Sequence, residues 1–180
     1  MNKYIVSLVF ILFSLSCLAG NSAPYIGQEN REVKSLSKIE VEGYLAGKGM
    51  GIAKAAELNG YPGPRHVLDL SKELNLTEDQ IRKSNSLFTT MQSETINLGA
   101  SLIQKEKELD ELFFSGNVDH NKLEISLSQI GKIKSKIRMS HLSAHIEQKK
   151  VLTTHQVSLY AHYRGYSGSR SALKNQSHHH

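Results

Sequence analysis

Two histidines in the stretch "RMSHLSAHIEQ" have the spacing of a metal-binding pair. His141 and His145 are four residues apart, and on a helix this spacing places both imidazole rings on one face, where they can share one ion. The alternative is a structural role, because such pairs also occur on half-exposed helix faces where each ring is solvated or hydrogen-bonded. A metal site needs further donors, and these must come from another element.

The segment before the turn "SGNVDH" is predicted to face this pair. Long helical patterns lie on both sides of residues 115–118, and helices joined by so short a turn run antiparallel. In that arrangement His141 lies opposite Gln92, and His145 lies opposite Phe88.

Three more residues are candidate donors. Met91 and Glu94 lie within one helical turn of the facing positions, and His66 joins them if the segment before the hairpin folds back onto it. A thioether and a carboxylate beside imidazoles suit zinc, nickel, cobalt or copper without selecting among them. The sequence therefore predicts a transition-metal site with His141, His145, Met91, Glu94 and His66 as ligands.

A short phrase, Leu-Thr-x-x-Gln followed by an aliphatic residue, occurs twice and marks two helix starts. In "LNLTEDQI" the Thr77 hydroxyl can accept from the backbone N–H of Gln80, while the Gln80 side chain accepts from the Thr77 N–H, which makes a capping box. The stretch "VLTTHQVS" repeats the arrangement with Thr153 and Gln156. Each phrase by itself predicts a helix start and no chemistry.

Apolar spacing around these phrases predicts the elements that hold the candidate site. One helical stripe runs from Ile81 to Phe114, and a second follows the turn. Short helices are expected over 37–46, 52–58 and 64–74 before the hairpin, and over 153–163 after it. The residues of the second stripe expected to be buried are Leu123, Leu127, Ile130, Ile133, Ile137 and Ala144. No strand pattern competes, so we predict an all-α fold: a long antiparallel helical hairpin with short N-terminal helices and a short C-terminal helix.

The N-terminus reads as a secretory signal peptide. Residues 1–19 carry one lysine near the start, an apolar run of about a dozen residues, and small residues where a signal peptidase would cut. We therefore expect cleavage near Ala19. The run is shorter than the roughly 20 apolar residues of a membrane span. Lipidation at Cys17 is the alternative, although Ser14 stands three residues before it where an aliphatic residue is expected.

The mature chain is then divided into three parts. Residues 20–36 are polar and lack periodicity, which predicts a flexible leader; residues 37–166 form the helical domain; and residues 167–180 are expected to be a disordered tail. The tail ends in three histidines, which are either native or the stub of a purification tag.

Composition limits the classes of function. Cleavage removes the only cysteine, so we expect neither a disulfide nor a thiolate ligand. The formal net charge of +5 favours acidic surfaces as partners rather than nucleic acid, which an exported chain seldom meets. The chain has no nucleophile elbow, no phosphate-binding glycine loop and no His-Glu-x-x-His motif. We therefore expect a protein that is not an enzyme.

The signal peptide, the helical hairpin and the two Leu-Thr-x-x-Gln phrases together resemble the periplasmic LTxxQ group. This group comprises the Spy and CpxP envelope-stress proteins and heavy-metal sensor or resistance proteins of the ZraP and CnrX type. The resemblance covers about residues 64–164, and includes Tyr160 and Arg164 after the second phrase. It implies a non-enzymatic, often dimeric periplasmic protein. In the metal-sensing members, a histidine with a second ligand four residues later lies in the helix that corresponds to the one after the turn, where His141 and His145 stand.

Three functions follow from the residues and the resemblance together. The first is a periplasmic stress protein that binds a transition metal through histidines, as a sensor or buffer. The second is an ATP-independent chaperone for unfolded polypeptides, suggested by cations along residues 132–138 and by apolar residues outside the main stripe, namely Ile96, Ile103, Phe114 and Ile125. The third is a CpxP-like partner that restrains a membrane-bound signalling protein. A homodimer is expected in each case.

Overall fold

The computed structural model describes residues 23–166, which form helices and no strand. The predicted all-α class is therefore confirmed for this part of the chain. The helices are α1 (Lys38–Leu45), α2 (Lys54–Glu57), α3 (Pro64–Asp69), α4 (Glu78–Phe114), α5 (His120–Val151) and α6 (Thr154–Tyr163). The expected signal peptide over 1–19 and the expected tail over 167–180 lie outside the described residues.

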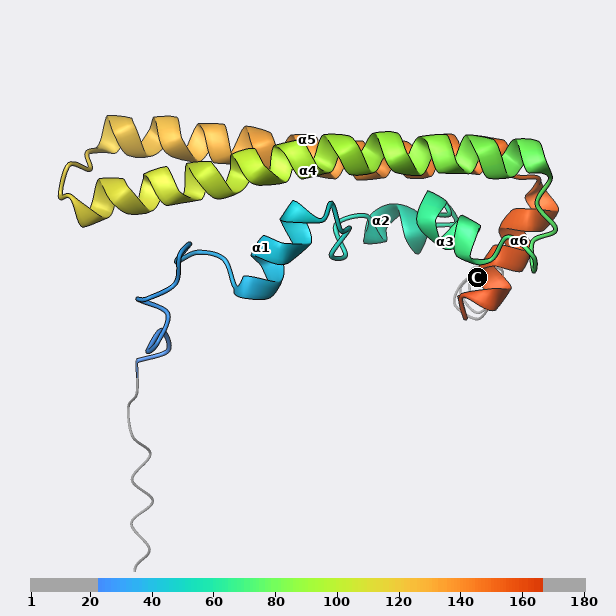
Figure 1. Cartoon of the computed structure of the whole chain (residues 1–180), viewed down its shortest axis with the longest axis horizontal. Coiled ribbons are helices and arrows are strands. Elements are labelled where there is room, and N and C mark those ends of the chain that lie inside the picture. Colours follow the sequence, from blue (N-terminus) through green and yellow to red (C-terminus); the bar gives the residue numbers. More distant parts are fainter. Residues whose placement is uncertain (1–22, 167–180) are drawn as a thin grey trace, which may run out of the picture.

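Helices α4 and α5 form the long antiparallel hairpin that the sequence predicts (Figure 1). The chain reverses at Gly116, whose φ of 68° is the left-handed conformation that glycine adopts without steric cost. Hydrogen bonds across the hairpin join Gln148 to Ser84 at 3.0 Å and Ser140 to Glu94 at 2.7 Å. These pairs fit the predicted register, in which residues near 141–145 face residues near 88–92.

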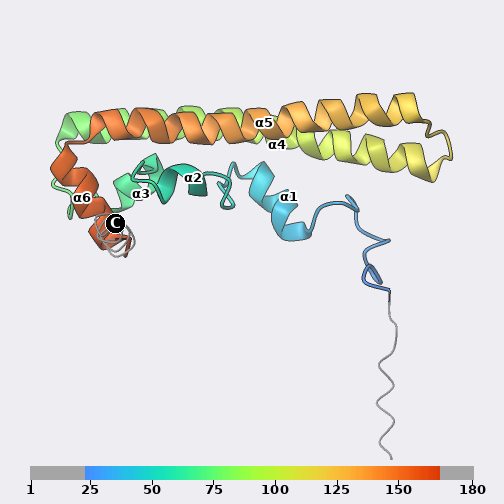
Figure 2. The ribbon, with the colours of Figure 1, turned by 180° about the vertical axis from the view of Figure 1, so that it is seen from behind.

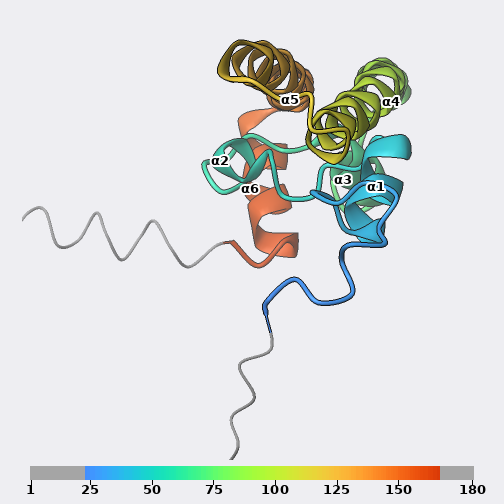
Figure 3. The same cartoon turned by 90° about the vertical axis from the view of Figure 1, so that its left-hand side faces the viewer.

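The segment before α4 lies along one face of the hairpin. Figures 1 and 3 show α1, α2 and α3 in a layer beneath α4 and α5, with α6 at the end of the same layer. This N-terminal layer begins earlier than the sequence indicates. Val33 and Leu36, in the expected flexible leader, are only 2% and 6% exposed and pack with Ile103. Part of the leader is therefore docked, because these two apolar residues pack against α4.

Contact between α1 and α4 depends on a glycine in the middle of the long helix. A Cβ atom at Gly99 would lie 2.4 Å from the backbone oxygen of Tyr44, far closer than real atoms approach. The absence of a side chain lets α1 rest directly on α4, and Gly99 is buried there. This close approach places the loop after α1 against the hairpin face.

The two Leu-Thr-x-x-Gln phrases meet in space. Both capping boxes form as predicted, at Thr77 and Thr153. The two glutamines then bond each other: Gln80 Nε2 donates to Gln156 Oε1 at 2.8 Å, and Gln156 Nε2 donates to Gln80 Oε1 at 3.0 Å. Gln156 also donates to the backbone oxygen of Leu74 at 3.1 Å. The repeated phrase therefore clasps the start of α6 to the start of α4, and turns α6 away from the hairpin axis (Figure 2).

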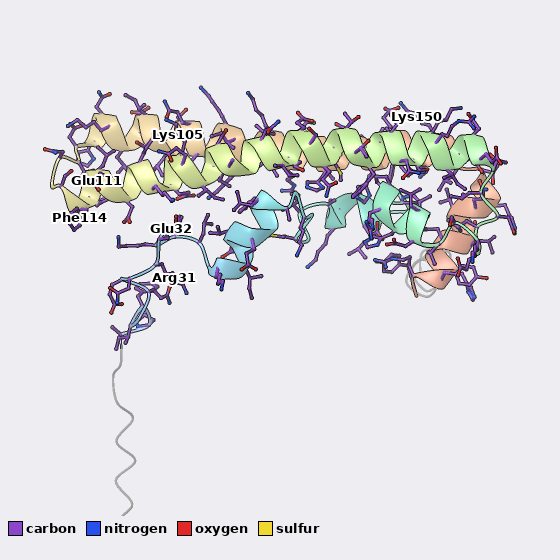
Figure 4. All side chains as sticks on the ribbon, viewed as in Figure 1. Arg31, Glu32, Lys105, Glu111, Phe114 and Lys150 are labelled. Atoms are coloured by element: carbon purple, nitrogen blue, oxygen red, sulfur yellow. The ribbon has the colours of Figure 1, made fainter. Side chains whose placement is uncertain are left out.

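The tip of the hairpin exposes several large apolar side chains. Phe113 and Phe114 are 56% and 82% exposed, and Ile125 and Leu127 are each 50% exposed; Figure 4 shows Phe114 at the tip. The prediction that Leu127 is buried is wrong, because α5 turns Ile130 and Ile137 toward α4 and Leu127 lies off that buried face. Within residues 23–166, no helix is apolar over enough of its length to cross a membrane.

Candidate metal centre

A cavity of about 470 Å³ lies between the hairpin and the N-terminal layer, and four of the five predicted ligands line it. They are His66, Met91, His141 and His145. The hairpin supplies one wall, and the loop over residues 46–49 and the start of α3 supply the other. The expected folding back of the segment that carries His66 therefore brings it to the same cavity.

His141 is the most isolated polar group in this cavity. Its side chain is on the buried hairpin face, with 4% of the residue exposed, and its Nε2 atom has no hydrogen-bond partner. Gly49 lies against the ring, since a Cβ there would be 3.7 Å from Cε1. Burial, followed by the nearby His145, lowers the pKa of His141 below its usual value. The ring is thus neutral at pH 7, as a ligand histidine must be.

His145 is held in the tautomer that suits a ligand. Its Nδ1 atom lies 2.7 Å from the backbone oxygen of Tyr61, and a carbonyl oxygen only accepts, so Nδ1 carries the hydrogen. In the neutral ring Nε2 then has a free lone pair. The Nε2 edge faces Gly63 in the cavity wall, where a Cβ would lie only 3.0 Å from Nε2. Glycine at this position leaves the edge accessible.

Glu57 is a functional candidate that the sequence analysis missed. Its Oε1 atom accepts from the Tyr160 hydroxyl at 2.5 Å and the Tyr166 hydroxyl at 3.3 Å, and lies 3.4 Å from Arg164 Nε. Its Oε2 atom is buried without a hydrogen-bond partner, 3.8 Å from His145 Nδ1. The Tyr160 pKa is raised, first by burial and then by the hydrogen bond to this carboxylate.

The sequence pointed to only part of the cluster that Glu57 forms with Tyr160 and Arg164. Tyr160 and Arg164 were singled out after the second phrase, but their acidic partner lies about a hundred residues earlier on α2, which has four residues. So short a helix has no recognisable amphipathic pattern. Only the folded layer brings Glu57 next to His145.

Glu94 is not brought to the cavity. It accepts a hydrogen bond from Ser140 at 2.7 Å and lines a separate depression that also includes Met139 and Met91. Glu94 lies on a neighbouring face of α4, not on the face that points to the N-terminal layer. Its closeness in sequence to Met91 and Gln92 did not show this difference. His66 is at the cavity but partly exposed, and its Nδ1 lies 3.7 Å from Asp69 Oδ2.

The donor set in the cavity is therefore two buried imidazoles and a thioether, with a third imidazole nearby. Among residues 23–166, histidine, cysteine, aspartate and glutamate side chains form no group of three placed to hold a metal ion. Of the other predicted ligands, Met91 lines the same cavity as His141 and His145 and is itself only 8% exposed. Imidazole nitrogen and thioether sulfur are donors for soft or borderline transition metals.

The chain has been compared with known proteins at three levels. No family model, no characterised protein and no solved structure matches it.

Proposed function

We propose that this protein binds a transition-metal ion through His141 and His145, as a sensor or buffer in the periplasm. The observation that supports the proposal is a pair of buried imidazoles in one cavity, one with an unpartnered Nε2 and the other with its Nδ1 against a backbone carbonyl oxygen. A buried nitrogen without a partner costs free energy, and a bound ion would remove that cost.

Copper fits the donor set best among the four metals considered. Glu94, the hard oxygen donor in the predicted set, is bonded to Ser140 instead. The remaining donors are nitrogen from His141 and His145 and sulfur from Met91, and thioether sulfur favours Cu(I) over zinc, nickel and cobalt. When bound, the ion would supply a positive charge that fixes both imidazoles and holds the N-terminal layer against the hairpin.

The resemblance to the LTxxQ group supports the location and the class of protein. The hydrogen bonds between Gln80 and Gln156 give the repeated phrase a structural role in the helical scaffold. A homodimer in the periplasm remains part of the proposal.

Calorimetric titration of the mature protein with Cu(I), Zn²⁺, Ni²⁺ and Co²⁺ tests the metal proposal. The three terminal histidines are replaced by alanine so that they cannot contribute. We expect the tightest binding with Cu(I), and at least a 100-fold loss in the His141→Ala, His145→Ala double variant. The matched control is His155→Ala, His162→Ala, which removes two exposed histidines of α6 and should leave the affinity unchanged. Equal losses in both variants would contradict the assignment.

A second function is favoured by a different region. The exposed apolar residues near the turn, Phe113, Phe114, Ile125 and Leu127, suit weak binding of unfolded polypeptides by an ATP-independent chaperone. Suppression of the aggregation of a denatured client without ATP tests this, with Phe113→Ser, Phe114→Ser as the variant. The chaperone proposal fails if that variant protects the client as well as the wild type does.

A further inference from the structure

Glu57 lies between the candidate metal centre and α6. One of its carboxylate oxygens faces the metal centre, and the other faces α6. Oε2 lies 3.8 Å from Nδ1 of His145, and Oε1 is shared by Tyr160, Tyr166 and Arg164. We propose that Glu57 is a positioning residue that couples metal binding at His145 to the docking of α6. This inference rests on the proposed metal-binding function.

The first half of the coupling is the contact with His145. Metal-ligating histidines commonly direct the other ring N–H to a carboxylate or a backbone carbonyl, which fixes the ring and raises its basicity. Here Nδ1 already donates to the oxygen of Tyr61 at 2.7 Å, and the Glu57 carboxylate is the nearest acidic group. Oε2 has no hydrogen-bond partner, so it is free to respond when a cation on Nε2 makes the Nδ1 hydrogen more positive.

The second half is the anchoring of α6. Tyr160 is 2% exposed and donates its hydroxyl hydrogen to Glu57 Oε1 at 2.5 Å. Arg164, the C-cap of α6, is within 3.4 Å of the same oxygen through Nε. Both residues belong to the element that begins with the second Leu-Thr-x-x-Gln phrase. The end of α6 away from that clasp is therefore tied to the carboxylate that faces the metal ligand.

A positive charge on the imidazole of His145 draws the carboxylate of Glu57 into a more fixed position. A fixed carboxylate in turn holds Tyr160 by a hydrogen bond and Arg164 by an ion pair in one geometry, and hydrogen bonds to an ionised acceptor are stronger than those between neutral groups. Coupling of this kind is reciprocal, so α6 should stabilise metal binding by the same factor by which metal stabilises docked α6.

Hydrogen exchange of the α6 amides, measured on the full mature chain with and without saturating Cu(I), tests the coupling. In the wild type we expect metal to slow exchange in α6 by roughly fivefold or more, the lower end of usual coupling factors. In Glu57→Gln, metal should still bind through the two imidazoles, but the exchange of α6 should no longer respond. Tyr160→Phe removes one hydroxyl and should likewise reduce the response and weaken Cu(I) binding.

Glu111→Gln is the matched control, because Glu111 is exposed near the hairpin tip (Figure 4). It should keep the full response of α6. If the wild type binds Cu(I) by calorimetry but α6 exchange is unchanged, the coupling is overturned and the metal site stands. The coupling is also overturned, with the metal site intact, if Glu57→Gln retains the full response. If calorimetry detects no binding at all, the metal-binding proposal is overturned, and the coupling with it.

Discussion

The two halves of the hairpin have the same local architecture but different surroundings. In the half that carries His141 and His145, the N-terminal layer and α6 cover one face, and polar residues such as Ser84, Thr95 and Gln148 are fully buried. Toward the turn, the N-terminal layer thins to a non-helical segment that packs on α4 through Val33 and Leu36, and apolar Phe114 at the tip is 82% exposed. The same kind of amphipathic helix thus supplies a buried site in one half and an open surface in the other.

The comparison shows that the candidate site is created by the segments that pack over the hairpin, rather than by the sequence of the hairpin helices alone. A two-helix hairpin has too little thickness to bury imidazoles by itself. The loops that pass Gly49 and Gly63 close over His141 and His145 and remove them from water. That removal lowers the pKa of His141 and leaves its Nε2 without a partner.

The largest expected effect contrasts a side chain that the N-terminal layer covers with one that it leaves open. Leu102 is fully buried beneath α1, whereas Leu127 is half exposed. Leu102→Ala should lower the free energy of unfolding by about 2–5 kcal/mol, because it leaves a cavity, and Leu127→Ala should change it by no more than about 0.5 kcal/mol. Urea unfolding followed by circular dichroism measures both. Similar losses would show that the uncovered half is buried in solution, as a dimer interface would make it.

Two glycines give the next contrast. A Cβ at Gly99 would meet the backbone oxygen of Tyr44, whereas a Cβ at Gly131 has nothing within 4 Å. Gly99→Ala should destabilise the protein by about 1–3 kcal/mol because α1 must move. Gly131→Ala should stabilise it by about 0.5–1 kcal/mol, because alanine is the better helix former. Thermal unfolding shows the opposite signs, and a stabilising Gly99→Ala would contradict the close docking of α1.

The clasp between the repeated phrases is tested by a glutamine pair. Gln156→Ala removes both hydrogen bonds to Gln80 and leaves the backbone oxygen of Leu74 without its side-chain donor, and should cost about 1–3 kcal/mol. The control, Gln104→Ala, removes an exposed side chain that bonds only to the neighbouring Glu108, and should have little effect. Denaturant titration compares the two. The clasp would be unimportant if both variants were equally stable.

The smallest expected effect is a pH dependence confined to the covered half. Because the His141 pKa is lowered in the folded state, the unfolded state takes up the proton first as pH falls. The stability from neutral His141 is therefore present above the ordinary histidine pKa of about 6.5 and is lost progressively below it. In metal-free buffer with chelator, His141→Gln should show a shallower fall in unfolding free energy between pH 7 and pH 5 than the wild type, and His155→Gln should not.

Local sequence determined the helices and their starts. Each capping box uses residues only three apart, as with Thr77 and Gln80, so its energy does not depend on the rest of the fold. The apolar stripes and the short turn at Gly116 then fix the antiparallel hairpin and its register, and with it the approach of His141 and His145 to the face of α4 that carries Met91.

Tertiary structure alone decided which of the candidate residues meet. Glu94 lies one helical step off the covered face and bonds Ser140, while Glu57 reaches His145 from a four-residue helix with no pattern of its own. The packing of Val33 and Leu36 was likewise settled by where the N-terminal layer runs, and the exposure of Leu127 by the way α5 is rotated on α4. Helical periodicity predicts approximately which residues share one face of a helix. Whether those residues are buried, and what they contact, depends on which distant segment packs on that face.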